Sequence, residues 1–254
     1  MSGFAADFRG ARVRPSPNFG QRVAVTAPDM ILLHYTGMES AQGAEDWLCD
    51  ERSGVSSHYL VHEDGAVVQM VPEAARAWHA GKSSWQGETD INSRSVGIEI
   101  VNPGHFLGYP DFPAVQIDAV IALCRDVAAR HAVAPERVLA HSDVAVGRKI
   151  DPGEKFPWDL LHAAGVGHLV TPSPIADAEE TKPGSEGFAV KGIQEQLRLY
   201  GYDIETTGIF DERTRVVVEA FQRHFRPSRV DGVADRSTQE TLARLIDTLD
   251  RAVA

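Results

Sequence analysis

The feature that most constrains this chain is a polar, proline-containing segment that follows its first two thirds. Residues 171–187 read TPSPIADAEETKPGSEG, which combines three prolines with small and acidic residues and lacks any hydrophobic periodicity. A segment of this composition cannot build a core and is typical of a linker. We therefore divide the 254-residue chain into a unit at 1–170, a linker at 171–187 and a smaller unit at 188–254.

Composition excludes several classes of protein. Hydrophobic residues make up 43% and charged residues 24% of the chain, which is an ordinary globular balance. The net charge is −11, so the basic field that a nucleic-acid-binding protein needs is missing. No apolar run approaches the roughly 20 residues that span a bilayer. We expect neither a nucleic-acid partner nor a membrane span.

The first residues contain no apolar signal segment. We therefore expect a cytoplasmic protein, with a periplasmic location as the alternative. The two cysteines, Cys49 and Cys124, form neither a disulfide framework nor a CxxC pair, and both read as small hydrophobic residues. No pattern in the sequence indicates an oligomeric state.

The larger unit alternates between strand and helix patterns, which predicts an α/β domain with a mixed sheet flanked by helices. An Asp-Gly pair at 64–65 favours a hairpin turn between two of the strands. The expected strands cover 30–35, 57–62, 66–71, 96–101 and 138–140, and the expected helices cover 112–131 and a short stretch from 157.

The smaller unit contains an internal repeat. GIFDERT at 208–214 is echoed by GVADRST at 232–238, each before a helical pattern. Asp211 and Asp235 can each cap the N-terminus of the helix that follows. With an earlier helical pattern around Val190 and Leu197, this predicts a small all-α domain of three helices.

Histidines are distributed unevenly. Nine of the ten lie within residues 34–168, and only His224 lies beyond, which places metal or acid–base chemistry in the larger unit. His34 and His141 each end a predicted strand, and Asp151 follows in a loop. Two histidines and a carboxylate suit a catalytic zinc ion with one position open to water. The alternative is two ordinary histidines and a turn-forming aspartate.

Two further charged residues are candidates for a functional role. Glu99 interrupts the apolar strand VGIEIV, where a charge is costly unless it is used or paired. Its alternative interpretation is a strand face exposed to solvent, since alternation would expose Gly97, Glu99 and Val101 together. Lys149 lies two residues before Asp151, so both can face the same side of an extended loop. Taken alone, Lys149 reads as a solvated lysine.

Six short motifs in order give the larger unit a family resemblance over about residues 20–165. The motifs are LHYTG at 33–37, SHY at 57–59, RAWHAG at 76–81, SVGIE at 95–99, AHSD at 140–143 and GRKIDPG at 147–153. With them the chain resembles the zinc-dependent N-acetylmuramoyl-L-alanine amidases of the peptidoglycan-recycling type, which share a fold with peptidoglycan recognition proteins. This resemblance implies one zinc ion per chain, bound by His34, His141 and Asp151, with Glu99 and Lys149 as catalytic residues.

The smaller unit resembles the three-helix peptidoglycan-binding module over about residues 188–250. The matching positions include IQEQL at 193–197, Gly201-Tyr202 and Phe221-Gln222, and most of them suit core or capping roles. In the larger unit we also expect Tyr35 and His79 to contact substrate, and the alternative for His79 is a structural role.

The implied reaction is hydrolysis of the amide between the lactyl group of N-acetylmuramic acid and L-alanine, in peptidoglycan or in (anhydro-)muropeptides. Glu99 is expected to act as general base and acid, and Lys149 to stabilise the oxyanion. Two alternatives are a non-catalytic recognition protein on the same fold and an endopeptidase that cuts within the stem peptide.

Overall fold

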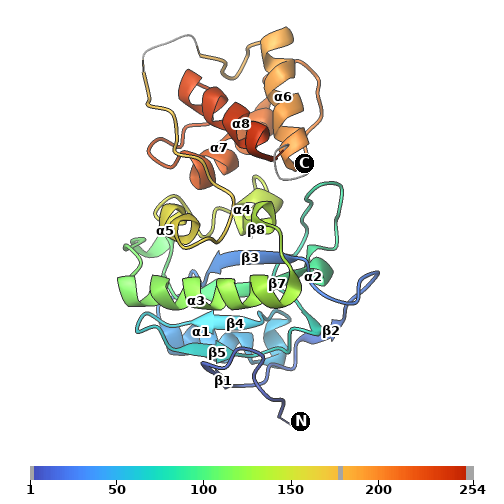
Figure 1. The fold of residues 1–254 in the computed structure, drawn as a ribbon, viewed down its shortest axis with the longest axis vertical. Coiled ribbons are helices and arrows are strands. Elements are labelled where there is room, and N and C mark those ends of the chain that lie inside the picture. The colour runs from blue at the N-terminus through green and yellow to red at the C-terminus, as the bar shows by residue number, and fades with distance from the viewer. Residues whose placement is uncertain (1–2, 177–179, 250–254) are drawn as a thin grey trace.

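The structure is a computed structural model that describes residues 3–176 and 180–249. Its centre is a six-stranded mixed sheet, and a separate two-stranded antiparallel pair lies beside it (Figure 1). In spatial order the large sheet contains β1 (Ala11–Val13), β5 (Val67–Gln69), β4 (Tyr59–Val61), β7 (Ser95–Ile100), β3 (Met30–Tyr35) and β8 (Val138–Ala140). The small pair is β2 (Phe19–Gln21) with β6 (Ala75–Ala77).

Helices cover both faces of this sheet. Those of the first 170 residues are α1 (Ala41–Leu48), α2 (Ile91–Arg94), α3 (Ala114–His131), α4 (His141–Val144) and α5 (Trp158–Ala163), with single 3₁₀ turns at Glu51–Ser53, His105–Leu107 and Pro135–Arg137. The helix α3 lies along one face, where Ile117, Val120 and Leu123 pack onto Ile31 and Ile98 of the sheet. On the opposite face, α1 covers one half of the sheet around Leu60 and Val68.

Three helices form the C-terminal unit, which we define as residues 180–249, in contrast to the N-terminal unit at 3–170. They are α6 (Phe188–Tyr200), α7 (Glu212–Phe225) and α8 (Arg236–Leu249). The Asp211 side chain accepts from the Thr214 N–H at the start of α7, and Asp235 accepts from the Thr238 N–H at the start of α8. These two caps agree with the prediction from the repeated motif.

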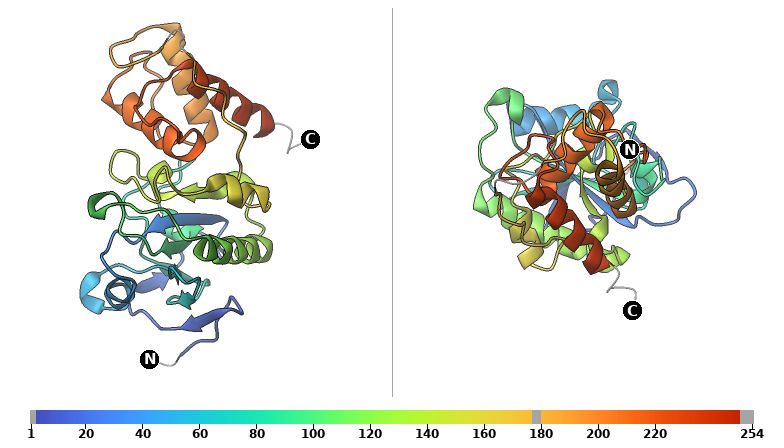
Figure 2. Two further views of the ribbon diagram at one scale, coloured as in Figure 1. Left: turned by 90° about the vertical axis from the view of Figure 1, so that its left-hand side faces the viewer. Right: turned by 90° about the horizontal axis from the view of Figure 1, so that it is seen from above.

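The two units pack directly against each other. The C-terminal helices lie above the β8 edge of the sheet and above α4 (Figures 1 and 2). One hydrophobic cluster contains residues of both units, with Met30 and Trp85 from the first and Tyr202 and Phe221 from the second. The Trp85 ring meets the Tyr202 ring edge-on, with centroids 5.0 Å apart. The C-terminal unit is therefore docked on the sheet domain through a shared core.

The predicted fold class is confirmed, namely a mixed sheet flanked by helices and followed by a small all-α part. The strands 30–35 and 138–140 were predicted with their observed bounds, whereas the observed β4 and β5 are shorter than predicted. The division of the chain at 171–187 stays a prediction. Within that segment, Thr181 pairs with Ala234, and the Gly187 N–H donates to the Gly208 carbonyl, so its second half lies on the C-terminal unit.

Candidate metal centre and active-site pocket

Parallel strand pairing brings the candidate residues to one edge of the sheet. His34 on β3 lies opposite Glu99 on β7, so their side chains project from the same face near the ends of both strands. Leu33 lies opposite Ala140, the last residue of β8, and His141 follows immediately. The carboxyl ends of adjacent parallel strands meet at one edge of a sheet, where sites are commonly built.

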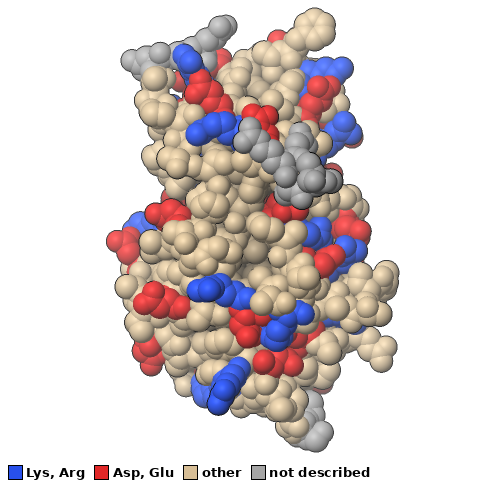
Figure 3. Space-filling view, in the orientation of Figure 1, with Lys and Arg blue, Asp and Glu red and all other residues tan. Residues whose placement is uncertain are grey.

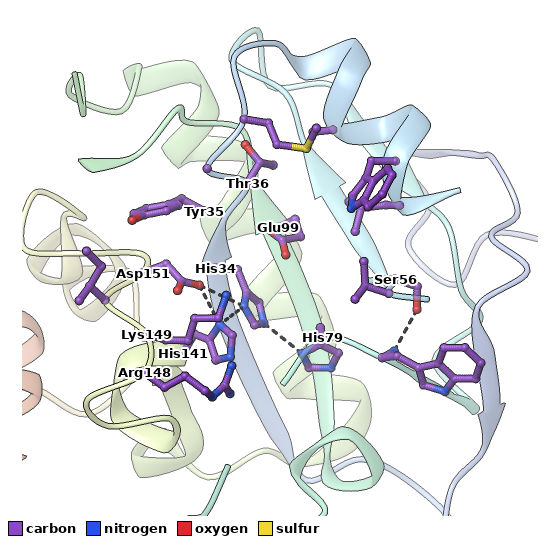
Figure 4. A pocket seen from close by; sticks show the side chains of 18 of the residues that line it. His34, Tyr35, Thr36, Ser56, His79, Glu99, His141, Arg148, Lys149 and Asp151 are labelled. Carbon is purple, nitrogen blue, oxygen red and sulfur yellow. Dashed lines mark hydrogen bonds and ion pairs between the residues drawn. The ribbon is translucent and has the colours of Figure 1, made fainter. Parts of the chain in front are cut away.

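His34, His141 and Asp151 converge at this edge (Figure 4). The two Nδ1 atoms of the histidines lie 2.9 Å apart. The Asp151 Oδ2 atom lies 3.2 Å from His34 Nδ1 and 2.9 Å from His141 Nδ1. All three residues are buried. Residues 107 and 117 positions apart in the chain therefore offer three potential ligand atoms to one point.

The surrounding hydrogen bonds indicate that these atoms suit a cation. His141 Nε2 lies 3.0 Å from the Ala80 carbonyl, to which it can only donate, so Nδ1 of the neutral ring carries a lone pair. That lone pair faces a carboxylate oxygen and a second imidazole nitrogen. Three electron-rich atoms this close repel one another unless a proton or a metal ion lies among them. Two histidines and one aspartate match the ligand preferences of zinc.

Burial and neighbouring charge keep His34 and Asp151 in forms that can bind a metal. Burial, followed by the nearby His141, lowers the pKa of His34 to about 4, so the ring is neutral near pH 7. Burial alone would raise the pKa of Asp151, but the adjacent rings of His141 and His34 outweigh burial and lower it below its usual range. Metal binding requires an unprotonated imidazole and an ionised carboxylate.

Glu99 faces the same pocket and is not on a solvent-exposed strand face. Its Oε2 atom is buried and has no hydrogen-bond partner among the described residues. Burial and the charge of Asp151 raise the pKa of Glu99 well above its ordinary value, with Lys149 acting in the opposite direction. An unpaired buried carboxyl group is costly, which makes such a group a candidate for function.

The pocket has a volume of about 440 Å³ and is open to solvent beside the three potential ligands. Arg148 and Lys149 come into it from the loop that also carries Asp151 (Figure 4). Trp47 and Phe106 line it as well, with Phe106 almost fully exposed and Trp47 about half exposed. The pocket thus joins a candidate metal site, a carboxyl group, two cations and exposed aromatic surface.

His79 lies directly behind one potential metal ligand. Its Nδ1 is 3.0 Å from His34 Nε2 (Figure 4). Its Nε2 is 3.3 Å from the Ser95 hydroxyl. A Cβ atom at Gly97 would come within 2.5 Å of the His79 ring, so glycine in β7 makes room for that ring. The sequence marked Gly97 only as part of a motif, and its packing role was missed.

Tyr35 lines the pocket on the other side of His34. Its hydroxyl lies 3.0 Å from Nδ1 of His105, whose Nε2 lies 3.1 Å from Glu154 Oε2. Burial raises the pKa of Tyr35 to about 12, so the phenol is neutral. His105 and Glu154 were missed as partners of Tyr35, because neither residue lies in any of the six motifs.

Charges of both signs are interspersed over the face drawn in Figure 3. Lys and Arg side chains on that face lie beside Asp and Glu side chains. Among the described residues, no helix combines the length and apolarity that crossing a bilayer requires.

Comparisons with known proteins agree with this geometry. Residues 24–154 match the N-acetylmuramoyl-L-alanine amidase family, and residues 186–242 match the peptidoglycan binding domain family. The chain is 35% identical to the N-acetylmuramoyl-L-alanine amidase AmiD of Escherichia coli K12 over 230 residues, 86% of this chain and 82% of that protein. It is 31% identical to the 1,6-anhydro-N-acetylmuramyl-L-alanine amidase AmpD of Citrobacter freundii, over 64% of this chain and 91% of that protein.

Solved structures show the same relationship. The complex of E. coli AmiD with anhydro-N-acetylmuramic acid-L-Ala-D-γ-Glu-L-Lys superposes with a TM-score of 0.75 at 34% identity, covering 90% of this chain and 93% of the other. AmpDh3 of Pseudomonas aeruginosa gives a TM-score of 0.71 at 28% identity, covering 96% and 98%. The family match, the shared fold and the converging His-His-Asp site lead to one conclusion: the chain belongs to the N-acetylmuramoyl-L-alanine amidase family.

Proposed function

We propose that this protein is a zinc-dependent N-acetylmuramoyl-L-alanine amidase. Its substrate is peptidoglycan or a muropeptide, and the bond cleaved joins the lactyl carbonyl of N-acetylmuramic acid to the nitrogen of L-alanine. The observation that carries the proposal is the convergence of His34, His141 and Asp151, with ligand atoms 2.9–3.2 Å apart, beside the unpaired carboxyl group of Glu99.

His34 and His141, through Nδ1, and Asp151, through Oδ2, would hold one zinc ion. Zinc supplies a Lewis acid that polarises a carbonyl and lowers the pKa of water to about 7. The His141 bond to the Ala80 carbonyl fixes the orientation and tautomer of one ligand. The hydrogen bond between His79 and His34 fixes the orientation and tautomer of His34 in the same way. This interpretation gives His79 a supporting role in addition to the substrate contact expected from the sequence.

Glu99 moves the proton. Amides resist hydrolysis because water is a weak nucleophile and the amine is a poor leaving group. The Glu99 Oε2 atom accepts the proton of the attacking water and returns it to the departing nitrogen of L-alanine. A pKa raised above its ordinary value suits this shuttle, because the group must both accept and release a proton near neutral pH.

Lys149 supplies positive charge where the oxyanion develops. It is exposed at the pocket, next to Arg148, and can approach a bound carbonyl group without rearrangement of the sheet. Tyr35, held by His105, forms part of the wall against which the substrate lies. The C-terminal unit binds peptidoglycan and raises the local concentration of substrate at the pocket.

The test combines metal content with product masses. Purified protein should contain about one zinc ion per chain, lose activity on chelation and regain it with zinc. Mass spectrometry of a digested muropeptide should show intact sugar and intact peptide. Shortened peptides would instead identify an endopeptidase, and binding without any cleavage would identify a recognition protein. Full activity in a metal-free preparation would refute the zinc assignment.

A further inference from the structure

A buried polar cluster joins the two units immediately beside the candidate metal centre. At its middle lies Asp143 of α4, which is fully buried. One carboxylate oxygen, Oδ2, accepts from the Ala140 N–H at 2.8 Å and from His224 Nδ1 at 2.7 Å. The other, Oδ1, accepts from the Tyr202 hydroxyl at 2.7 Å. Two of these three donors come from the C-terminal unit.

The backbone that this carboxylate holds also carries a potential metal ligand. Ala140 ends β8, His141 begins α4, and Asp143 follows two residues later. In the same turn, the Ser142 N–H donates to the Asp151 carbonyl at 3.0 Å. The turn at 140–143 therefore connects the backbone of His141 with that of Asp151, and Asp143 fixes the turn through the Ala140 N–H.

The donors of the C-terminal unit are themselves held rigidly. The His224 ring is stacked between Trp158 of the N-terminal unit and Phe225 of α7, with centroid distances of 3.7 and 3.8 Å. The Tyr202 ring packs against Trp85. Without these two donors, Asp143 would be a buried carboxylate with a single hydrogen bond, which is a costly arrangement. The side chain would then turn toward water and release the Ala140 N–H.

We propose that the C-terminal unit completes the metal centre, because Tyr202 and His224 act through Asp143 as positioning residues for the ligand His141. This inference rests on the proposed zinc-dependent function. The geometry of metal ligands has to be held within about 0.5 Å by the groups around them. By supplying two of these groups, the C-terminal unit has a role beyond binding of polymeric substrate. His224 is the one histidine beyond residues 34–168, and it supports the metal site through its hydrogen bond to Asp143.

Full-length variants test the proposal without dividing the chain. Tyr202→Phe removes one donor and keeps the ring. His224→Phe removes the other and keeps the aromatic stack, whereas His224→Asn keeps an N–H donor near the position of Nδ1. Tyr200→Phe is the matched control, because the Tyr200 hydroxyl bonds His168 of the N-terminal unit at 2.9 Å and forms no hydrogen bond with α4 among the described residues. It removes an equivalent bond between the units.

Three kinds of measurement should be made for each variant. They are the zinc dissociation constant by competition with a chromophoric chelator, the visible absorption spectrum after cobalt substitution, and kcat and KM on a soluble muropeptide at saturating zinc. We expect the double variant Tyr202→Phe/His224→Phe to bind zinc about 10–100-fold more weakly, the range for losing outer-shell support. Its cobalt spectrum should change and its kcat should fall, while KM for the soluble substrate stays close to that of the parent.

The single variants and the control make the result decisive even if the double variant folds poorly. Tyr202→Phe alone should weaken zinc binding, His224→Asn should restore most of what His224→Phe loses, and Tyr200→Phe should lower thermal stability without changing the zinc constant or the spectrum. Parental zinc affinity and cobalt spectra in Tyr202→Phe and His224→Phe would overturn the inference. A parent protein that binds no zinc would instead overturn the proposed function.

Discussion

Replacing Glu99 with glutamine separates proton transfer from metal binding. Glutamine keeps the size of the side chain and one carbonyl acceptor, but it cannot take up a proton near neutral pH. The Oε2 atom that is replaced has no hydrogen-bond partner among the described residues, so the substitution breaks no bond of the folded protein. Its effect should therefore fall on the reaction and not on the fold.

The magnitude follows from the role. Loss of general acid–base catalysis lowers kcat by about 10²–10⁴-fold. This equals about 3–5 kcal/mol of transition-state stabilisation, at about 1.4 kcal/mol for each factor of ten. Substrate affinity should change little, because the proton is transferred only in the transition state.

Stability should move in the opposite direction to activity. The pKa of Glu99 is raised in the folded protein above its ordinary value of 4.5, so ionising the group costs stability as the pH rises above that value. A neutral glutamine removes this cost. The metal-free Glu99→Gln variant should therefore be at least as stable as the parent at pH 7, as measured by urea unfolding.

The assay is release of intact peptide from a soluble muropeptide, followed by mass spectrometry, with zinc content measured on the same sample. Glu63→Gln is the matched control, because Glu63 is exposed in a turn between β4 and β5 and should behave like the parent. Parental kcat in Glu99→Gln would refute the proposed shuttle. Loss of zinc together with activity would show that Glu99 is a ligand, and the His-His-Asp assignment would be wrong.

Two further perturbations test the rest of the site, and a third tests His58, a buried residue just before β4. Asp151→Asn should weaken zinc binding more strongly than the loss of a residue that only supports a ligand, which typically costs about 10–100-fold in affinity. Parental zinc content after dialysis would contradict the role of Asp151 as a ligand. Gly97→Ala would place a Cβ atom 2.5 Å from the His79 ring. It should lower the free energy of unfolding, measured in urea, by about 1–3 kcal/mol. It should also weaken zinc binding, because His79 contacts His34. An unchanged free energy of unfolding would show that the His79 ring moves freely. Burial, followed by the charge of Arg22, lowers the pKa of His58 to about 3, below the ordinary histidine pKa of 6.5. The neutral His58 ring therefore stabilises the folded protein fully above pH 6.5, and this contribution declines as the pH falls below that value. The metal-free His58→Gln variant should then lose less stability than the parent between pH 6.5 and 4.5, and equal losses would refute this.

Local patterns sufficed for much of the framework. The strand 30–35 is apolar and short, so its bounds follow from composition alone. Asp211 and Asp235 cap their helices because a capping bond joins residues three apart. The candidate ligands His34 and His141 could be proposed because each comes at the end of a strand, where parallel pairing brings side chains together.

Other features depend on which surfaces meet. Alternation places Glu99 on one face of β7, but only the assembled pocket shows that one of its carboxylate oxygens, Oε2, is buried there without a partner among the described residues. A histidine behind another histidine carries no sequence signal, so the support of His34 by His79 could not be inferred from spacing. The glycine that admits the His79 ring is likewise explained only by the packing around it.

The contact between the two units is the clearest case of a feature decided by tertiary structure. The polar segment 171–187 interrupts the hydrophobic periodicity, but composition says nothing about whether the parts on either side pack together. Tyr202 and His224 lie 59 and 81 positions from Asp143, and their hydrogen bonds exist only because the C-terminal unit docks on α4. A periodic pattern reports the faces of a single helix or strand, whereas the partner of each face is chosen by shape and by the burial of polar groups across the whole chain.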